Sequence, residues 1–182
     1  MEKDKHSRIV LDQPSVNTLI AWILKENGQE VFRTLKATHE DDHIHLKFSG
    51  MNYDAIPGGM NIPSVGRVHP LQTLVGDSIE GDLSLRLDGR HLKGKIDLHG
   101  LGPAILQNIP GIDSIVFLFA PHLKEIGAFR IHGPCDFDFD LSSLEVPDGK
   151  GGEMAVTELV ELHSIEVGTT DREMLIVSFS VK

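Results

Sequence analysis

The sequence predicts one domain of the α+β class, spanning residues 1–182, in which helices cover the apolar face of an antiparallel sheet. Three observations lead to this prediction: an amphipathic helix pattern at residues 14–27, apolar and polar residues that alternate in hairpin-like pairs, and a second apolar helical pattern at residues 103–127. A sheet with one apolar face must bury that face against another layer, and the helices supply that layer.

Residues 14–27, PSVNTLIAWILKEN, carry the clearest helix pattern. Apolar side chains recur at the spacing of one helix face, and Gly28 follows as a stop signal. That face consists of Val16, Leu19, Ile20, Ile23 and Leu24. Trp22 lies off its centre, which predicts a place at the rim or in solvent.

Residues 39–43 read His-Glu-Asp-Asp-His and match the H-E-x-x-H pattern of zinc peptidases. The pattern has chemical meaning only on a helix, where both imidazoles share one face and the glutamate acts as general base beside the metal-bound water. The flanking residues instead alternate with a period of two, which predicts a hairpin that turns at Asp41-Asp42.

In this hairpin we expect Leu35 to lie opposite Phe48, with His39 on the same apolar side. The opposite face then carries Glu40, His43, His45 and Lys47. The two histidines of the peptidase pattern therefore point in opposite directions, and a peptidase is disfavoured. His43 and His45 nevertheless have a spacing that can place two imidazoles on one metal ion, with Glu40 as a third ligand.

The next 31 residues, 50–80, are rich in glycine and proline and show no clear periodicity, which predicts an irregular loop or an edge segment. Connections of this length are often functional. A second hairpin is predicted from alternating leucines at 83–87, a turn at Gly89-Arg90 and a return strand at 92–98.

The helical pattern at 103–127 is interrupted near Pro110 and Pro121, and its SIVFLF run fits a buried strand equally well. Strands return from residue 128, where Phe137 and Phe139 alternate with aspartates that we expect to face solvent. The chain ends in a predicted strand pair, ELHSIEVG and REMLIVSFSVK.

Composition excludes several classes of function. The net charge of -10 disfavours nucleic acid and strong binding to anionic membranes. The only cysteine, Cys135, excludes an internal disulfide.

The opening MEKDKHSRIV lacks the apolar region of a signal peptide, and the longest apolar run is too short to cross a bilayer, so a soluble, cytoplasmic protein is expected. The chain has no G-x-S-x-G motif and no dinucleotide fingerprint, so we expect no cofactor and favour a protein that is not an enzyme.

The order of elements resembles the bacterial small lipid-binding proteins of the tubular lipid-binding (TULIP) type. The resemblance rests on the helix SVNTLIAWIL ahead of the first hairpin and on the closing pattern DLSSLEVPDG...LVELHSIEVGTTDREMLIVSFSVK. It spans most of the chain but includes no diagnostic motif. It implies a curved antiparallel sheet wrapped around one long N-terminal helix, plus a second apolar helical region. The chain departs from the many relatives that are exported or anchored in a membrane, because it shows no such segment.

The resemblance also implies an apolar groove between helix and sheet. An apolar ligand in such a groove gains about 25 cal/mol for each Å² that it removes from water. The same side chains would line a closed core equally well, and both alternatives stay open. The implied groove residues are Leu19, Ile20, Ile23, Leu24, Leu83, Leu85, Ile96, Phe117 and Phe119.

The sequence therefore predicts non-enzymatic binding of a lipid or another apolar small molecule. One alternative is a metal-binding protein or metal-dependent hydrolase that uses Glu40, His43 and His45. Another is a protein-interaction module that uses a sheet edge or residues 50–80. In that case the acidic face of the protein would favour a basic partner.

Overall fold

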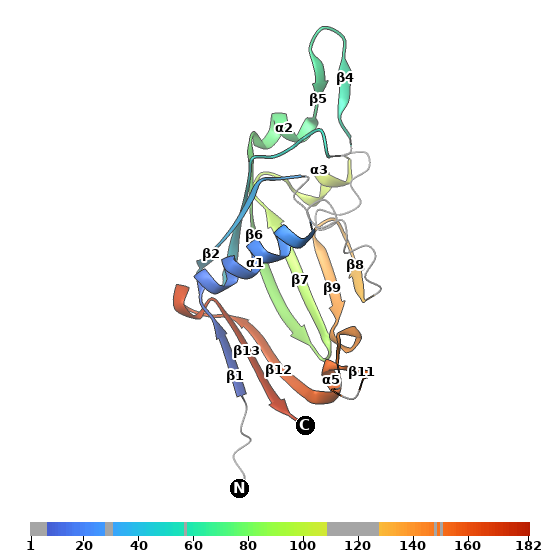
Figure 1. Ribbon diagram of the computed structural model, residues 1–182. Coiled ribbons are helices and arrows are strands. Elements are labelled where there is room, and N and C mark those ends of the chain that lie inside the picture. The colour runs from blue at the N-terminus through green and yellow to red at the C-terminus, as the bar shows by residue number, and fades with distance from the viewer. Residues whose placement is uncertain (1–6, 28–30, 57, 109–127, 148, 150) are drawn as a thin grey trace.

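The computed structural model describes residues 7–27, 31–56, 58–108, 128–147, 149 and 151–182. Figure 1 shows a long antiparallel sheet with a smaller sheet packed at one end and a hairpin projecting from the other. The strands are β1 (Ser7–Leu11), β2 (Thr34–Glu40), β3 (His43–Ser49), β4 (Met60–Ile62), β5 (Gly66–Val68), β6 (Ser78–Asp88), β7 (His91–Leu98), β8 (Phe129–Ile131), β9 (Asp136–Asp140), β10 (Glu145–Pro147), β11 (Glu153–Ala155), β12 (Val160–Val167) and β13 (Leu175–Val181). The helices are α1 (Gln13–Asn27), α2 (Pro70–Val75), α3 (Pro103–Gln107) and α5 (Val156–Leu159), with 3-10 turns η2 (Leu141–Ser143) and η3 (Asp171–Glu173).

Antiparallel pairing organises all the strands that are described. The large sheet has the order β2-β3-β6-β7-β9-β8, and the smaller one has the order β1-β13-β12. Two further two-stranded ribbons pair β4 with β5 and β10 with β11. The pairing of β1 with β13 joins the two ends of the chain, for example at Ile9 and Val177.

The first predicted hairpin is confirmed. β2 pairs with β3 so that Leu35 lies opposite Phe48 and His39 lies opposite Ile44. Asp41 occupies the turn with a φ of 44°, the left-handed conformation that aspartate tolerates better than most residues. The H-E-x-x-H sequence is therefore a hairpin tip and not a helix.

The core lies on one face of the large sheet. One row of cross-strand neighbours on this face runs from Ala37 through Leu46 and Gly81 to Leu98. The side chains of Ala37, Leu46 and Leu98 are buried. Strand residues point alternately to the two faces, so the residues between these neighbours form the polar face of the same sheet. The second predicted hairpin, β6 with β7, contributes to both faces and is confirmed.

Helix α1 packs against β2, which is an edge strand of the large sheet (Figure 1). The Asn17 side chain donates to the Ala37 carbonyl at 2.7 Å and accepts from the Ala37 N–H at 2.8 Å. Gln13 Oε1 accepts the N–H of His39 at 2.8 Å. These two amide side chains take the place of a further strand, which protects the edge of the sheet from pairing with another chain.

The predicted fold class is wrong. The structure is mostly β, with 50% strand and 21% helix, and its strands divide among several antiparallel sheets. The N-terminal helix has 15 residues and so spans only about 22 Å, and it packs against β2 instead of forming a long axis for a single curved sheet. The error arises because alternation marks strands without showing which strands share a sheet. In the second predicted helical region α3 is short, and residues 109–127 lie outside the described residues.

The smaller sheet contacts the large one and contributes residues to the core. β12 packs against β6, and Met174 and Ile176 beside and within β13 are buried in the core. The imidazole Nε2 of His39 lies 2.7 Å from the carbonyl oxygen of Gly168, which follows β12. The predicted pairing of the last two strands is confirmed.

The described part of residues 50–80 contains more regular secondary structure than the sequence predicts. They form the β4–β5 hairpin, then α2, and then the start of β6. The hairpin projects from the molecule (Figure 1) and exposes Met60, Ile62 and Val65. In the described residues, no helix is long and apolar enough to cross a membrane.

We predict that Asn17→Ala lowers the free energy of unfolding by about 1–3 kcal/mol, because it removes both hydrogen bonds to Ala37 and leaves partly buried backbone groups without them. Thr18→Ala is the matched control, since the Thr18 hydroxyl bonds only within its own helix, to Pro14. Urea unfolding monitored by circular dichroism measures both changes. Equal losses in the two variants would show that the Asn17 pair does not anchor the helix.

Candidate functional site

Three side chains converge on the polar face of the large sheet: His45 of β3, Asp82 of β6 and His99, which directly follows β7. His45 lies opposite Asp82 in the antiparallel register. The His99 N–H donates to the Glu80 carbonyl at 2.9 Å, which continues the ladder past the end of β7 and brings the imidazole beside Asp82. We call these three residues the His45 cluster.

The Asp82 carboxylate lies between the two imidazoles. Its Oδ1 is 3.0 Å from His45 Nδ1, and its Oδ2 is 2.8 Å from His99 Nε2. The two rings are tilted by 36° with their centroids 5.4 Å apart. The His45 side chain is 14% exposed and that of His99 is 50% exposed, so the cluster has a fixed inner side and an outer side open to solvent.

A second layer of charge supports the cluster. Glu80 Oε2 lies 3.8 Å from His45 Nε2, on the opposite side of the ring from Asp82. Lys47 Nζ is 2.6 Å from Glu80 Oε1, and the hydrogen bond from this ammonium group lowers the pKa of Glu80. Glu80 is therefore held as a carboxylate that faces the outer nitrogen of His45.

The cluster also shifts the acid–base equilibria of its members. Partial burial opposes ionisation of Asp82, but hydrogen bonds with His99 and His45 outweigh it and lower the pKa of Asp82. The hydrogen bond to Asp82 raises the pKa of His99 above its ordinary value of 6.5. The aspartate thus stays ionised over a wide pH range, which is the form that a cation requires.

The donor atoms are close enough to bind one ion. His45, Asp82 and His99 each offer a ligand atom, and these atoms lie within 4.8 Å of one another; no other such set of three occurs in the part of the chain that the structure describes. Two ligands of a tetrahedral zinc ion, each about 2.0–2.1 Å from the metal, lie roughly 3.3 Å apart. The separations of 3.0 and 2.8 Å, which each histidine nitrogen makes with a different oxygen of Asp82, are close to this value, and all three ligand atoms lie within 4.8 Å of one another.

The sequence-predicted metal ligands are partly brought together. His45 belongs to the cluster, and His43 Nε2 lies 3.5 Å from Asp82 Oδ1 and 3.8 Å from Glu40 Oε2. His43 Nδ1 also lies 3.2 Å from Asp42, and this hydrogen bond raises the pKa of His43. His43 and Glu40 therefore lie at the margin of the cluster.

Asp82 and His99 were missed because they are distant in sequence. Asp82 is 37 residues from His45, and His99 is 17 residues further along the chain. The signal that would have found them is the register: once the first hairpin and β6 are aligned by their apolar residues, polar residues of the two strands fall opposite one another.

The predicted groove residues have several different environments. Ile96 belongs to the buried core, Ile20 and Leu83 pack against it, and Leu19 is 47% exposed. The side chains of Ile23 and Leu24, and all of Phe117 and Phe119, lie outside the described residues. Trp22, which we expected at the rim or in solvent, is 61% exposed.

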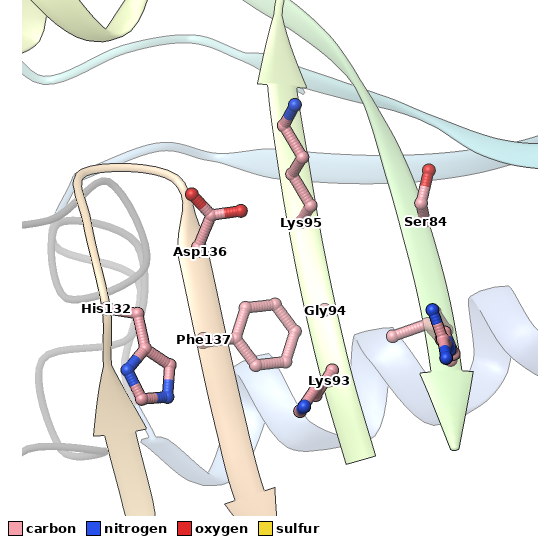
Figure 2. A pocket seen from close by; sticks show the side chains of 9 residues that line it. Ser84, Lys93, Gly94, Lys95, His132, Asp136 and Phe137 are labelled. Carbon is pink, nitrogen blue, oxygen red and sulfur yellow. The ribbon is translucent and has the colours of Figure 1, made fainter. Parts of the chain in front are cut away.

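Leu85, the remaining predicted groove residue, borders a cavity of about 240 Å³ at β6, β7 and β9. Figure 2 shows the Phe137 ring beside Gly94, with Lys95 and His132 nearby. A Cβ atom at Gly94 would lie 2.0 Å from the Phe137 ring, so only glycine allows this placement.

A second histidine–aspartate group lies on the same polar face. His91 Nδ1 is 2.9 Å from Asp138 Oδ1, and His132 Nε2 is 3.6 Å from Asp138 Oδ2. Partial burial opposes ionisation of Asp138, but the two histidines outweigh it and lower its pKa. Asp138 is only 7% exposed, although the sequence predicted a solvent-facing aspartate.

Burial also raises the pKa of the Cys135 thiol, which disfavours the reactive thiolate.

We predict that Asp82→Asn lowers the pKa of His99 towards about 6.5, because the carboxylate that stabilises the imidazolium is lost. Titration of the histidine ring signals by NMR measures this, with Asp136→Asn as the control on the same face. An unchanged His99 pKa would show that the two side chains do not interact in solution.

The same pair predicts the direction of a pH effect on stability. The folded-state pKa of His99 is raised, so its stabilisation is fully present below the unfolded value and is lost as pH rises through the folded value. Asp82→Asn should therefore destabilise the protein more at about pH 6 than at about pH 8, as urea unfolding at the two pH values would show. A pH-independent loss would contradict the assignment.

Comparisons with protein-family models, with curated proteins and with solved structures found no match to this chain. The resemblance to tubular lipid-binding proteins stays a prediction.

Proposed function

We propose that this protein binds a divalent transition-metal ion, with Zn²⁺ as the representative ion, through the His45 cluster. The observation that carries the proposal is the convergence of three donor atoms within 4.8 Å of one another. Two imidazoles and one carboxylate suit Zn²⁺, and they also suit other first-row divalent ions.

The surroundings of the cluster support the proposal. A histidine that binds metal through one ring nitrogen commonly presents its other nitrogen to a carboxylate, which fixes the tautomer and the ring orientation. In His45, Nδ1 faces Asp82 and Nε2 faces Glu80, so both sides of the ring have the expected neighbours. Glu80 is in turn held by Lys47.

The consequence of binding follows from the positions of the ligands. The three residues come from β3, β6 and the segment after β7, so a bound ion would link three neighbouring strands. An ion that binds only the folded state stabilises it, by about 2.7 kcal/mol when its free concentration is 100 times the dissociation constant. Three protein ligands also leave a tetrahedral ion one position for water.

We predict that the metal-stripped protein binds one Zn²⁺ per chain and that His99→Ala weakens this binding about tenfold or more, because a direct ligand is lost. Isothermal titration calorimetry measures the affinity, and metal analysis after gel filtration measures the stoichiometry. His91→Ala is the matched control, since His91 pairs with an aspartate on the same face outside the cluster. Glu80→Gln should weaken binding less than His99→Ala.

Two further variants separate the structural ligand set from the one predicted from sequence alone. Glu40→Gln and His43→Ala should reduce the affinity less than His99→Ala, because both residues lie at the margin of the cluster. Zn²⁺ binding that is absent in the unaltered protein, or that survives His99→Ala unchanged, would refute the proposal.

A small apolar ligand is a second candidate function, carried over from the sequence prediction. It is supported by the 240 Å³ cavity beside Leu85 and Phe137. That volume lies below the range of roughly 300–1,000 Å³ typical of small-molecule sites, so the metal site has the stronger support. Organic extraction of the purified protein followed by mass spectrometry tests this candidate, and extracts without a lipid would count against it.

A further inference from the structure

A second pocket lies in residues 50–80, which the sequence marked as a long connection with functional potential. Its volume is about 320 Å³, within the range of small-molecule sites. It is lined by residues of the 51–54 segment, of β5, and of the start of α2. Figure 1 shows the β4–β5 hairpin projecting beyond α2. The lining residues that matter for its chemistry are Tyr53, Asp54, Arg67, His69 and Gln72.

The His69 and Tyr53 side chains that line this pocket are held by hydrogen bonds. His69 is 2% exposed, and its Nδ1 accepts the N–H of Leu71 at 3.1 Å, so the ring is held by the first turn of α2. The Tyr53 ring lies 5.6 Å from it, and the Tyr53 hydroxyl donates to the Gly76 carbonyl. These contacts join the 51–54 segment to both ends of α2, and they give the pocket a defined shape.

Arg67 supplies the positive charge of the pocket, and its guanidinium group lies beside a glycine. A Cβ atom at Gly59 would lie 2.6 Å from Arg67 Nε and 3.2 Å from Arg67 Nη2. The guanidinium group therefore lies directly against the Gly59 backbone, in space that any other residue would occupy. The Arg67 side chain is also 43% exposed, so its guanidinium group is accessible to a ligand.

The partner that Arg67 has within the protein is easily exchanged. Asp54 Oδ1 lies 3.7 Å from Arg67 Nη1, and the Asp54 side chain is 78% exposed. An ion pair this long and this exposed contributes little free energy, because water and salt screen it. A ligand oxyanion that enters the pocket can replace Asp54 and form two parallel hydrogen bonds with the guanidinium group.

We propose that this pocket binds a small ligand through a carboxylate or phosphate group held by Arg67. The Gln72 side chain, which also lines the pocket, offers an amide donor and acceptor for the remainder of the ligand. The site is separate from the His45 cluster, because the two share no residue, and it does not depend on metal binding.

The test is a titration of the ¹⁵N-labelled protein with inorganic phosphate and, separately, with succinate, without added metal. We expect saturable shifts of the Arg67 Nε–H signal and of the backbone amide signals of the lining residues with at least one probe. The backbone signals measure the affinity of Arg67→Gln, which should be weaker by about tenfold or more. Preference for one probe identifies the phosphate or the carboxylate as the recognised group. Arg8→Gln is the matched control, because Arg8 forms a similar exposed pair with Glu173 at 3.9 Å but lines neither described pocket.

Gly59→Ala provides a variant that keeps every charge. Its added methyl group displaces the guanidinium group, so binding should weaken while the Arg67 signal stays observable. Asp54→Asn should strengthen binding, because it removes the competing carboxylate. Shifts that do not saturate with either probe, or equal affinities in the unaltered protein and Arg67→Gln, would overturn the proposal. A comparison of backbone spectra shows whether each variant is folded.

Discussion

The register between β3 and β6 is the constraint on which the rest of the structure depends. Side chains alternate between the two faces of a strand, so burial of Leu46 directs its neighbour His45 to the polar face. The same rule directs Asp82 outward from its place between Gly81 and Leu83. A slip of one residue would bury His45 and expose Leu46, so the apolar face holds the histidine opposite the aspartate.

Helix α1 and the smaller sheet hold this register from outside. Asn17 forms hydrogen bonds with both backbone groups of Ala37, so β2 is bound by α1 on one side and by β3 on the other. β3 is therefore an interior strand of the large sheet. His39 lies on the apolar side and contacts the Gly168 carbonyl, while His43 lies beside Asp82 on the polar face. The two histidines of the H-E-x-x-H sequence thus have separate roles, one joining the two sheets and one at the margin of the His45 cluster.

The two proposed sites use different physical means to attract ions of opposite charge. In the His45 cluster, Asp82 hydrogen-bonds both histidines, so the group is satisfied without an ion and a metal must displace protons to bind. In the pocket lined by Arg67, a single guanidinium group lies beside Gly59 and, among the described residues, forms an ion pair with the exposed Asp54 carboxylate. The first site depends on converging side chains, and the second depends on one exposed guanidinium group whose ion pair with Asp54 is easily exchanged.

The sequence alone determined the local structure of its most regular segments. The period of two around Asp41-Asp42 and Gly89-Arg90 was sufficient to predict both hairpins and the faces of their residues, and the stripe at residues 14–27 was sufficient to predict a helix. Only the tertiary structure decided how the strands divide into sheets, because pairings such as Ile9 with Val177 join distant residues whose local patterns carry no information about each other. The same holds for the candidate sites. His45 was recognisable as a candidate metal ligand, but its convergence with Asp82 and His99, and the contact of Arg67 with Gly59, arise from the alignment of separate segments, which local periodicity does not encode.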